Sequence, residues 1–370
     1  MESVKLDKRQ GEVKAWMQKR AGIASGLALR YALPRAPRAK PMTIPALPIS
    51  PDAPWLAPLA GFSDLAFRLL CREHGAAVCV TEMVSSKGLL YNSAGTRDLL
   101  ATTPDDSPLV VQLFGADPDF IARAVDTLLA QGSRYFDLNA GCPVPKVAKT
   151  GAGAALLKYP DLLVDIARAM ARAAGPGRTG VKLRLGWRPS EPVLHDLLPR
   201  LEDAGAAWAA IHPRFAVDGF SGAADRGAFA ALRERTTLPL IYSGDLFTAE
   251  DAAATLRETG AEGIMFARGA LADPGVFDRL RELLRGVAPS APTPASVAVM
   301  ARRYAELAAR HGNPHTALLK MRTVIPRFAR GLSGARALRK ALSSCNSWDE
   351  LYALIAAIES GETGADEKTT

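Results

Sequence analysis

The loop over residues 139–156 carries the clearest chemical signature of the sequence. It places Cys142 next to prolines at positions 143 and 145, and glycines follow at positions 151 and 153. Proline fixes the backbone beside the thiol, and the later glycines predict a mobile lid. Because no histidine lies next to Cys142 in sequence, we expect its thiol to donate a proton rather than to act as a nucleophile.

Polar residues also stand at the ends of several apolar runs. Four of these runs carry a polar side chain at or near their end, and each side chain is of a different type: Gln112, Lys182, His212 and Arg268. If the runs are parallel strands of one barrel, their carboxyl ends share one mouth, where such barrels build their active sites. One polar residue at a strand end is ordinary, but this set predicts that the four side chains converge.

Two consecutive runs end in glycine-containing turns, Ser243-Gly244-Asp245 and Ala267-Arg268-Gly269. Glycine lets backbone N–H groups approach a phosphate closely, and arginine offers a fixed fork of donors. The alternative is that the glycines only turn the chain into the next helix. The two turns together predict a site for a phosphorylated ligand.

The elements that must position these residues are alternating strands and helices. Eight short β-rich runs alternate with amphipathic helical segments over roughly 230 residues, close to the ~250 of a (β/α)8 TIM barrel. A doubly wound sheet is the competing architecture, but no run is followed by the G-x-G-x-x-G turn of a dinucleotide site. The predicted strands are Pro54–Leu59, Val78–Glu82, Leu109–Phe114, Tyr135–Asn139, Thr179–Leu185, Trp208–His212, Pro239–Ser243 and Gly263–Ala267.

Composition divides the chain into five parts. Residues 1–50 are basic and then proline-rich, which predicts an N-terminal extension. We expect the barrel over residues 51–286 and a proline-rich linker over residues 287–295. Residues 296–360 show only helical periodicity and predict a small all-α helical-bundle domain, followed by a tail over residues 361–370.

The net charge of +8 is unevenly distributed. Residues 1–40 carry ten lysines and arginines against three acidic residues, and residues 295–340 carry ten against one. Residues 41–294 carry 25 against 28. A single basic helix face is often only a solvated surface, but two basic ends around a near-neutral body indicate a polyanion partner, such as nucleic acid.

Several other classes of protein are disfavoured. No apolar run reaches the ~18–20 residues of a membrane span, and no signal peptide is evident. The four cysteines have no C-x-x-C spacing, which argues against a zinc site and a disulfide framework. We therefore expect a soluble, cytoplasmic protein without a bound metal. We also predict that it is a monomer.

Six segments together resemble the tRNA-dihydrouridine synthase family: residues 57–64, 111–115, 137–147, 181–187, 243–247 and 267–271. The resemblance extends from about residue 54 to about residue 355, and its Asn-x-Gly-Cys-Pro motif is highly specific. It implies an FMN-binding barrel followed by a helical domain that binds tRNA. It also implies that the carbon 5 to carbon 6 double bond of a uridine is reduced, with NADPH as the reductant.

The resemblance also implies a role for each candidate residue. Cys142 would give a proton to carbon 5 of uracil, while Asn139 and Arg214 would hold the target base. The flavin ring would lie against Pro58, Leu59 and Ala60, with Gln112 at its pyrimidine edge and Lys182 near the edge that carries negative charge on reduction. The other implied cofactor contacts are His212 and, around the phosphate, Ser243, Gly244, Asp245, Ala267 and Arg268.

Other functions remain open at this point. An FMN enzyme similar to dihydroorotate dehydrogenase would run the reverse pyrimidine chemistry, but it would have no use for a basic helical domain. A catalytically silent RNA-binding barrel is expected to have lost Cys142 or the phosphate site. Within the family, the substrate could also be ribosomal RNA, and the position of the modified uridine is left open.

Overall fold

The computed structural model describes residues 45–93, 95–313 and 315–360. The described residues all belong to the second of two compact units, which begins at Pro45. The basic segment 1–40 and the predicted tail over residues 361–370 lie outside the described residues.

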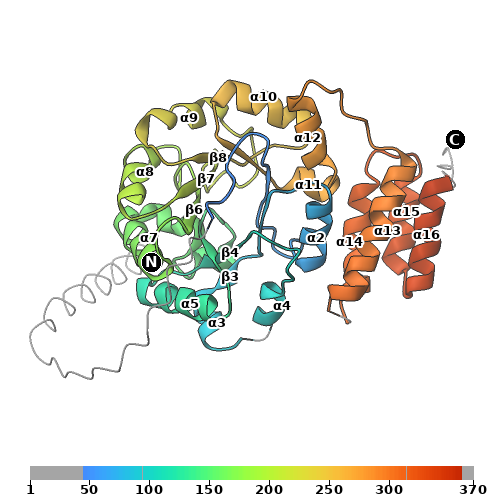
Figure 1. The fold of residues 1–370 in the computed structure, drawn as a ribbon, viewed down its shortest axis with the longest axis horizontal. Helices are drawn as coiled ribbons and strands as arrows, with labels where there is room; N and C mark the ends of the chain where they lie inside the picture. The colour runs from blue at the N-terminus through green and yellow to red at the C-terminus, as the bar shows by residue number, and fades with distance from the viewer. Residues whose placement is uncertain (1–44, 94, 314, 361–370) are drawn as a thin grey trace, which may run out of the picture. The chain divides into compact units, whose positions relative to one another are not determined.

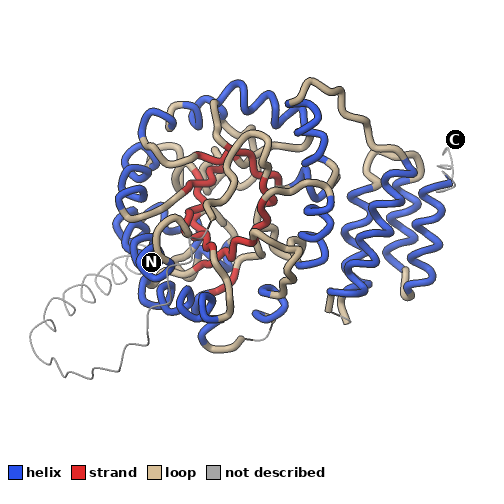
Figure 2. Tube along the Cα trace, in the orientation of Figure 1, coloured by secondary structure: helices blue, strands red, loops and turns tan. Residues whose placement is uncertain are grey.

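Eight parallel strands close into a barrel (Figure 2). The ring closes because β1 pairs with both β2 and β9, and β2 also pairs with β4. A ninth, two-residue strand, β3 (Val84–Ser85), pairs only with the end of β4. Each predicted run overlaps one barrel strand, so the predicted (β/α)8 barrel is confirmed. The barrel strands are β1 (Trp55–Leu56), β2 (Val78–Val80), β4 (Leu109–Phe114), β5 (Tyr135–Ala140), β6 (Thr179–Arg184), β7 (Trp208–His212), β8 (Leu240–Tyr242) and β9 (Gly263–Phe266).

Helices surround the strands (Figure 1). Their apolar faces pack on the barrel, as the amphipathic pattern predicts. The longer ones are α2 (Leu65–Glu73), α5 (Pro118–Ala130), α7 (Pro160–Ala174), α8 (Leu194–Asp203), α10 (Ala249–Thr259) and α12 (Val276–Leu284). The shorter ones are α3 (Ser86–Leu90), α4 (Thr96–Leu100), α6 (Pro145–Ala148), α9 (Arg226–Ala230), α11 (Arg268–Ala272) and two 3-10 turns, η1 (Gly153–Lys158) and η2 (Arg233–Arg235).

The amino end of the barrel is filled by two tryptophans. Trp55 and Trp208 begin strands β1 and β7, are fully buried, and meet edge to face with ring centroids 5.7 Å apart. Gly180 makes room for them, because a Cβ at this position would lie 2.0 Å from the Trp208 ring. The indole N–H of Trp55 donates to the Pro48 carbonyl at 2.8 Å. The segment before β1 therefore closes this end, and the opposite end is left for the site.

The C-terminal region is helical, as predicted, and consists of α13 (Pro294–His311), α14 (Ala317–Phe328), α15 (Ala335–Ser344) and α16 (Trp348–Ser360). Helix α13 begins with a capping box between Thr293 and Ser296. It packs against α2 of the barrel, where the rings of Phe67 and Tyr304 lie 6.0 Å apart and Arg303 pairs with Glu73 at 2.7 Å. The helical region is thus joined to the barrel by both apolar and ionic contacts.

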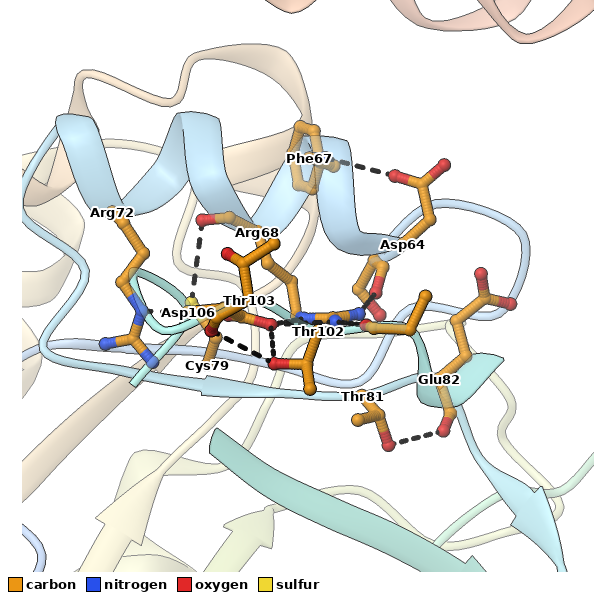
Figure 3. Close-up of polar contacts among 12 residues, drawn as sticks. Asp64, Phe67, Arg68, Arg72, Cys79, Thr81, Glu82, Thr102, Thr103 and Asp106 are labelled. Atoms are coloured by element: carbon orange, nitrogen blue, oxygen red, sulfur yellow. Dashed lines mark hydrogen bonds and ion pairs between the residues drawn. The ribbon is translucent and has the colours of Figure 1, made fainter. Parts of the chain in front are cut away.

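A buried ion pair lies beneath α2 (Figure 3). Arg68 and Asp106 are 0% and 1% exposed, and the Arg68 guanidinium donates to Asp106 Oδ2 at 2.8 and 3.0 Å. Arg68 also donates to the carbonyls of Ser63 at 2.7 Å and Ala101 at 2.6 Å. This one side chain therefore connects α2, the loop that follows β1 and the segment that precedes β4.

Candidate active site

The predicted site residues all lie at the carboxyl end of the barrel. Each comes from the last part of a strand or from the loop that follows it, because the strands are parallel and their polar residues are at their ends. In chain order they follow or end β1 (Pro58, Leu59, Ala60), β4 (Gln112), β5 (Asn139, Cys142), β6 (Lys182), β7 (His212, Arg214), β8 (Ser243, Gly244, Asp245) and β9 (Ala267, Arg268).

Hydrogen bonds fix the backbone of the thiol loop on both sides of Cys142. The side-chain oxygen of Asn139 accepts hydrogen bonds from the backbone N–H groups of Gly141 at 3.2 Å and Cys142 at 3.0 Å. The carbonyl of Cys142 accepts from the N–H of Ala154 at 2.9 Å. Cys142 itself is half-buried. The thiol is therefore presented on a fixed backbone, as the flanking prolines predict.

The prediction of a mobile lid after the thiol is wrong. Residues Gly153–Lys158 form the 3-10 turn η1, and Ala154, Leu156 and Leu157 are at most 1% exposed. Gly153 has φ of 63°, and a Cβ there would lie 2.7 Å from the Cys142 carbonyl oxygen. The glycine is needed for a close approach to the thiol loop, and the apolar residues after it belong to the core.

A chain of side-chain hydrogen bonds runs under the thiol loop. The Gln112 amide N–H donates to Asp137 Oδ2 at 2.7 Å, and the Asn139 amide N–H donates to Gln112 Oε1 at 2.8 Å. Gln112 and Asp137 are register partners of β4 and β5, which explains their contact. All three are at most 6% exposed. The bonds fix the orientation of both amides and connect the barrel interior to Cys142.

Two titratable side chains beside this chain, Asp137 and Lys182, have shifted pKa values. Burial raises the pKa of Asp137 to about 7, although the hydrogen bond from Gln112 and the charge of Lys182 oppose this. Burial also lowers the pKa of Lys182 to about 8, against the effect of Asp137. Among the residues that the structure describes, none forms a hydrogen bond or ion pair with the Lys182 ammonium, so its donors remain available at the mouth.

All the hydrogen-bond donors of the Arg214 side chain have partners inside the protein. Arg214 is 4% exposed, and its five N–H groups face five acceptors. Its guanidinium donates to His212 Nε2 at 3.0 Å, to both oxygens of Asp245, and to the carbonyls of Ser221 at 3.2 Å and Gly222 at 2.6 Å. Arg214 therefore fixes the loop that follows β7 and joins it to the turn that follows β8.

His212 is neutral in this environment. Burial and the positive charges of Lys182 and its neighbouring arginines lower the pKa of His212 to about 2. Because Nε2 accepts from Arg214, the proton of the neutral ring is assigned to Nδ1. His212 is thus a hydrogen-bond donor at the mouth over the whole physiological pH range.

The two glycine-containing turns are brought together by Asp245. Its carboxylate accepts from Arg214 and, at 2.8 Å, from Arg268. Burial would raise the pKa of Asp245, but the hydrogen bonds from Arg214 and Ala224 and the nearby arginines outweigh it and lower the pKa. Gly244 lies against His212, because a Cβ there would be 2.9 Å from the ring. The turns, Ser243 and Ala267 included, form one cationic corner of the mouth.

Known proteins resemble this chain over most of its length. The model of the family described as dihydrouridine synthase (Dus) matches residues 55–361. The chain belongs to the dihydrouridine synthase family. A probable tRNA-dihydrouridine synthase 1 of Synechocystis sp. is 34% identical over 296 residues, which cover 80% of this chain and 82% of that protein. A probable tRNA-dihydrouridine synthase of Mycobacterium tuberculosis is 35% identical over 314 residues, which cover 81% of this chain and 80% of that protein.

Two residues at the barrel mouth of this dihydrouridine synthase family member were not predicted from the sequence to have a role in the site. Asp137 fixes Gln112, and Arg184, 2% exposed, donates to the carbonyls of Gly141 at 3.0 Å and Phe215 at 2.9 Å. Arg184 therefore joins the thiol loop to the loop after β7. The signal was present: Asp137 and Asn139, like Lys182 and Arg184, are two residues apart in a strand, so each pair shares one face.

The loop that follows β1 stands apart from these hydrogen bonds. Within the described chain, no hydrogen bond joins Pro58, Leu59 or Ala60 to another predicted site residue. The loop is held instead by the Gly61 N–H, which donates to Glu82 Oε2 at 2.6 Å, and by α14, whose Lys320 pairs with Asp64 at 2.6 Å. It is a separate wall of the same mouth.

Two features are absent from the described residues. No group of three or more histidine, cysteine, aspartate or glutamate side chains among them is placed to hold a metal ion. None of their helices is both long enough and apolar enough to span a bilayer.

Proposed function

We propose that this member of the dihydrouridine synthase family is a tRNA-dihydrouridine synthase. It reduces the carbon 5 to carbon 6 double bond of uridines in tRNA, with FMN as cofactor, NADPH as reductant and Cys142 as proton donor. The supporting observation is that the Cys142 backbone, Asn139 and Gln112 form one hydrogen-bonded unit at the barrel mouth. Names and matches of the relatives support the same reading. We place the protein in the cytoplasm as a monomer.

The residues of the mouth fit FMN. The free donors of Lys182 suit a ring edge that carries negative charge, and Gln112 has a second amide N–H beyond the one given to Asp137. At the other side, Arg268 and the Nδ1–H of His212 provide donors for a phosphate. Gly244 brings the backbone close to His212. We assign the ring to Pro58, Leu59, Ala60, Gln112 and Lys182, and the phosphate to His212, Ser243, Gly244, Asp245, Ala267 and Arg268.

When bound and reduced, FMN supplies the hydride for carbon 6 of the uracil ring. Cys142 then donates its thiol proton to carbon 5, and solvent returns a proton to the sulfur. Asn139 keeps the thiol in place through the two backbone N–H groups that it accepts. Lys182 stabilises negative charge at the ring edge. The target base must leave the RNA stack to reach Cys142, at a cost of a few kcal/mol.

Asn139 and Arg214 can contact the target base only with donors that their existing hydrogen bonds leave available. Both ends of the Asn139 amide, and all five N–H groups of Arg214, already have partners inside the protein. Contact with a base requires Arg214 to give up or share one of these bonds, whereas Asn139 has one amide N–H directed only to the sulfur of Met83, at 3.7 Å. Asn139 is the better candidate of the two.

The proposed tRNA surface lies on α14, α15 and the turn between them. Of the basic residues there, Lys320 pairs with Asp64, Arg322 donates to the Cys345 carbonyl, and Arg327 lies over the Phe62 ring. The remaining residues are exposed and, within the described chain, have no partner: Arg330, Arg336, Arg339 and Lys340. Phosphate contacts are therefore expected from these four, together with the exposed Lys146 and Lys149 of the thiol loop.

Replacing Arg330, Arg336 and Arg339 together by alanine is expected to weaken tRNA binding similarly for different tRNAs. The slope of log affinity against log salt should become shallower by about 0.7–0.9 for each lost phosphate contact. Binding measured between 50 and 200 mM salt tests this, with Arg172, Arg235 and Arg257 replaced as a control. These three are exposed on the barrel helices, so the control removes the same charge elsewhere. Equal slopes for both triple variants would exclude α14 and α15 as the tRNA surface.

The proposed activity is tested with purified full-length protein, FMN, NADPH and unmodified transcripts of tRNA and ribosomal RNA. Formation of dihydrouridine in tRNA is expected. Formation of dihydrouridine in ribosomal RNA alone would mean that the substrate is ribosomal RNA and not tRNA. NADPH-independent oxidation of dihydroorotate, without any reaction on RNA, would support the alternative pyrimidine oxidoreductase.

A further inference from the structure

Arg268 contacts two aromatic rings. Its guanidinium carbon is 4.9 Å from the centroid of Phe220 and 4.8 Å from that of Phe247. The two residues are 62% and 44% exposed, and they are among the most exposed large apolar residues of the described chain. One exposed ring needs no explanation, but two exposed rings on one guanidinium form a defined site.

The two rings come from different loops, and both loops are fixed. Phe220 precedes Ser221 and Gly222, whose carbonyls accept from Arg214 at 3.2 and 2.6 Å. Phe247 follows β8, and its N–H donates to Asp251 Oδ2 at 3.0 Å, next to the capping box of α10. The rings are therefore held by backbone that is anchored independently of Arg268.

Arg268 has one further contact, with Asp245. Its Nη2 donates to Asp245 Oδ1 at 2.8 Å, and within the described chain this is its only hydrogen bond. Four of its five N–H groups remain free, although its side chain is 42% exposed. A long side chain at this exposure normally samples several rotamers, and ordering it costs free energy when a ligand binds. The two rings and Asp245 limit that freedom in advance.

We infer that Phe220 and Phe247 are positioning residues for the cofactor phosphate. They hold the Arg268 guanidinium in one plane, so that its free donors are ready for a phosphate monoester, and they make the site discriminate FMN from riboflavin. The inference rests on the proposed function, because it takes FMN as the ligand. The Phe247 ring acts through Arg268, and the Phe220 ring acts both through Arg268 and through His212, whose ring centroid lies 6.0 Å away. Neither ring needs to touch the cofactor.

The test compares the affinities of flavin-depleted, full-length protein for FMN and for riboflavin, measured by flavin fluorescence. Phe220→Leu and Phe247→Leu keep an apolar side chain but remove the ring face. Each should weaken FMN binding by about two- to fivefold and the double variant by about fivefold or more, with riboflavin binding unchanged. Phe220→Tyr should retain the parent affinity. Val217→Ala serves as the control, because Val217 is 56% exposed on the same loop.

Two outcomes would overturn the inference alone. If the double leucine variant loses FMN and riboflavin affinity equally, the rings contact the flavin ring rather than organise the phosphate site. If it retains the FMN affinity while Arg268→Ala lowers it, Arg268 needs no help from the rings. A parent protein that binds neither flavin would instead overturn the proposed function, and the inference with it.

Discussion

Replacing Cys142 by alanine is expected to slow dihydrouridine formation by about 10²–10⁴-fold, the usual contribution of a positioned general acid. The loss should be confined to this step. Asn139 bonds the backbone N–H of residue 142, which alanine retains, so the loop and the Gln112 bond to Asn139 should persist. Flavin content and the rate of flavin reduction by NADPH should therefore match those of the parent. Single-turnover reduction of tRNA, measured with pre-reduced enzyme, isolates the affected step.

The controls for this prediction come from the same loop and from the other cysteines. Cys345→Ala removes a buried thiol of the helical region and should leave turnover unchanged. Asn139→Ala keeps the thiol but releases its backbone, so it should also slow the step. Undiminished turnover by Cys142→Ala would remove the thiol from the mechanism, whatever the flavin content.

The barrel could be predicted because its signals are local. Each strand is a short apolar run, and turn residues separate it from the next amphipathic helix. The wrong prediction of a mobile lid over residues 153–158 also comes from relying on local signals. Glycines at positions 151 and 153 suggest mobility, but Gly153 is required by the close approach of the Cys142 carbonyl, and the following residues are buried against elements distant in sequence.

The chemistry of the site was only partly accessible from the sequence. Residues at strand ends could be collected at one mouth because parallel strands share an end. Their partners depend on register and on side-chain direction, which the sequence does not display. The bonds from Gln112 to Asp137 and from Arg214 to Asp245 cross between elements. With the bond from Arg268, they show that Asp245 also holds two arginines, which the sequence did not indicate.

Charge counting predicted a basic C-terminal region but not which charges are free. Lys320 pairs with Asp64 and Arg303 with Glu73, across separations of 256 and 230 residues. Counting charges segment by segment cannot reveal partners that lie so far apart in the sequence. Within the described chain, Arg330, Arg336, Arg339 and Lys340 have no such partner, so the proposed RNA surface of the helical region is centred on these four exposed residues.

The largest expected effect on stability is that of Asp106→Ala. This change leaves the Arg68 guanidinium buried without a counter-charge, with only the carbonyls of Ser63 and Ala101 as acceptors. Removing one partner of a buried ion pair typically costs about 3–5 kcal/mol. We expect a loss of this size in the free energy of unfolding, measured by urea denaturation. The double change of Arg68→Met with Asp106→Leu should recover part of it, because the buried Arg68 charge is then absent, whereas Arg72, whose Nε lies 3.8 Å from Asp106 Oδ1, still loses this partner.

Asp105→Ala is the matched control, because Asp105 is the exposed neighbour of Asp106 and should change the unfolding free energy by no more than about 0.5 kcal/mol. The ion pair also bears on the site. Arg68 holds the Ser63 carbonyl, and the loop before Ser63 carries Pro58, Leu59 and Ala60. Asp106→Ala should therefore weaken FMN binding at temperatures where the protein is still folded. Equal small effects of both alanine variants would mean that Arg68 finds other acceptors, and that this loop is held by its contacts with Glu82 and Lys320 instead.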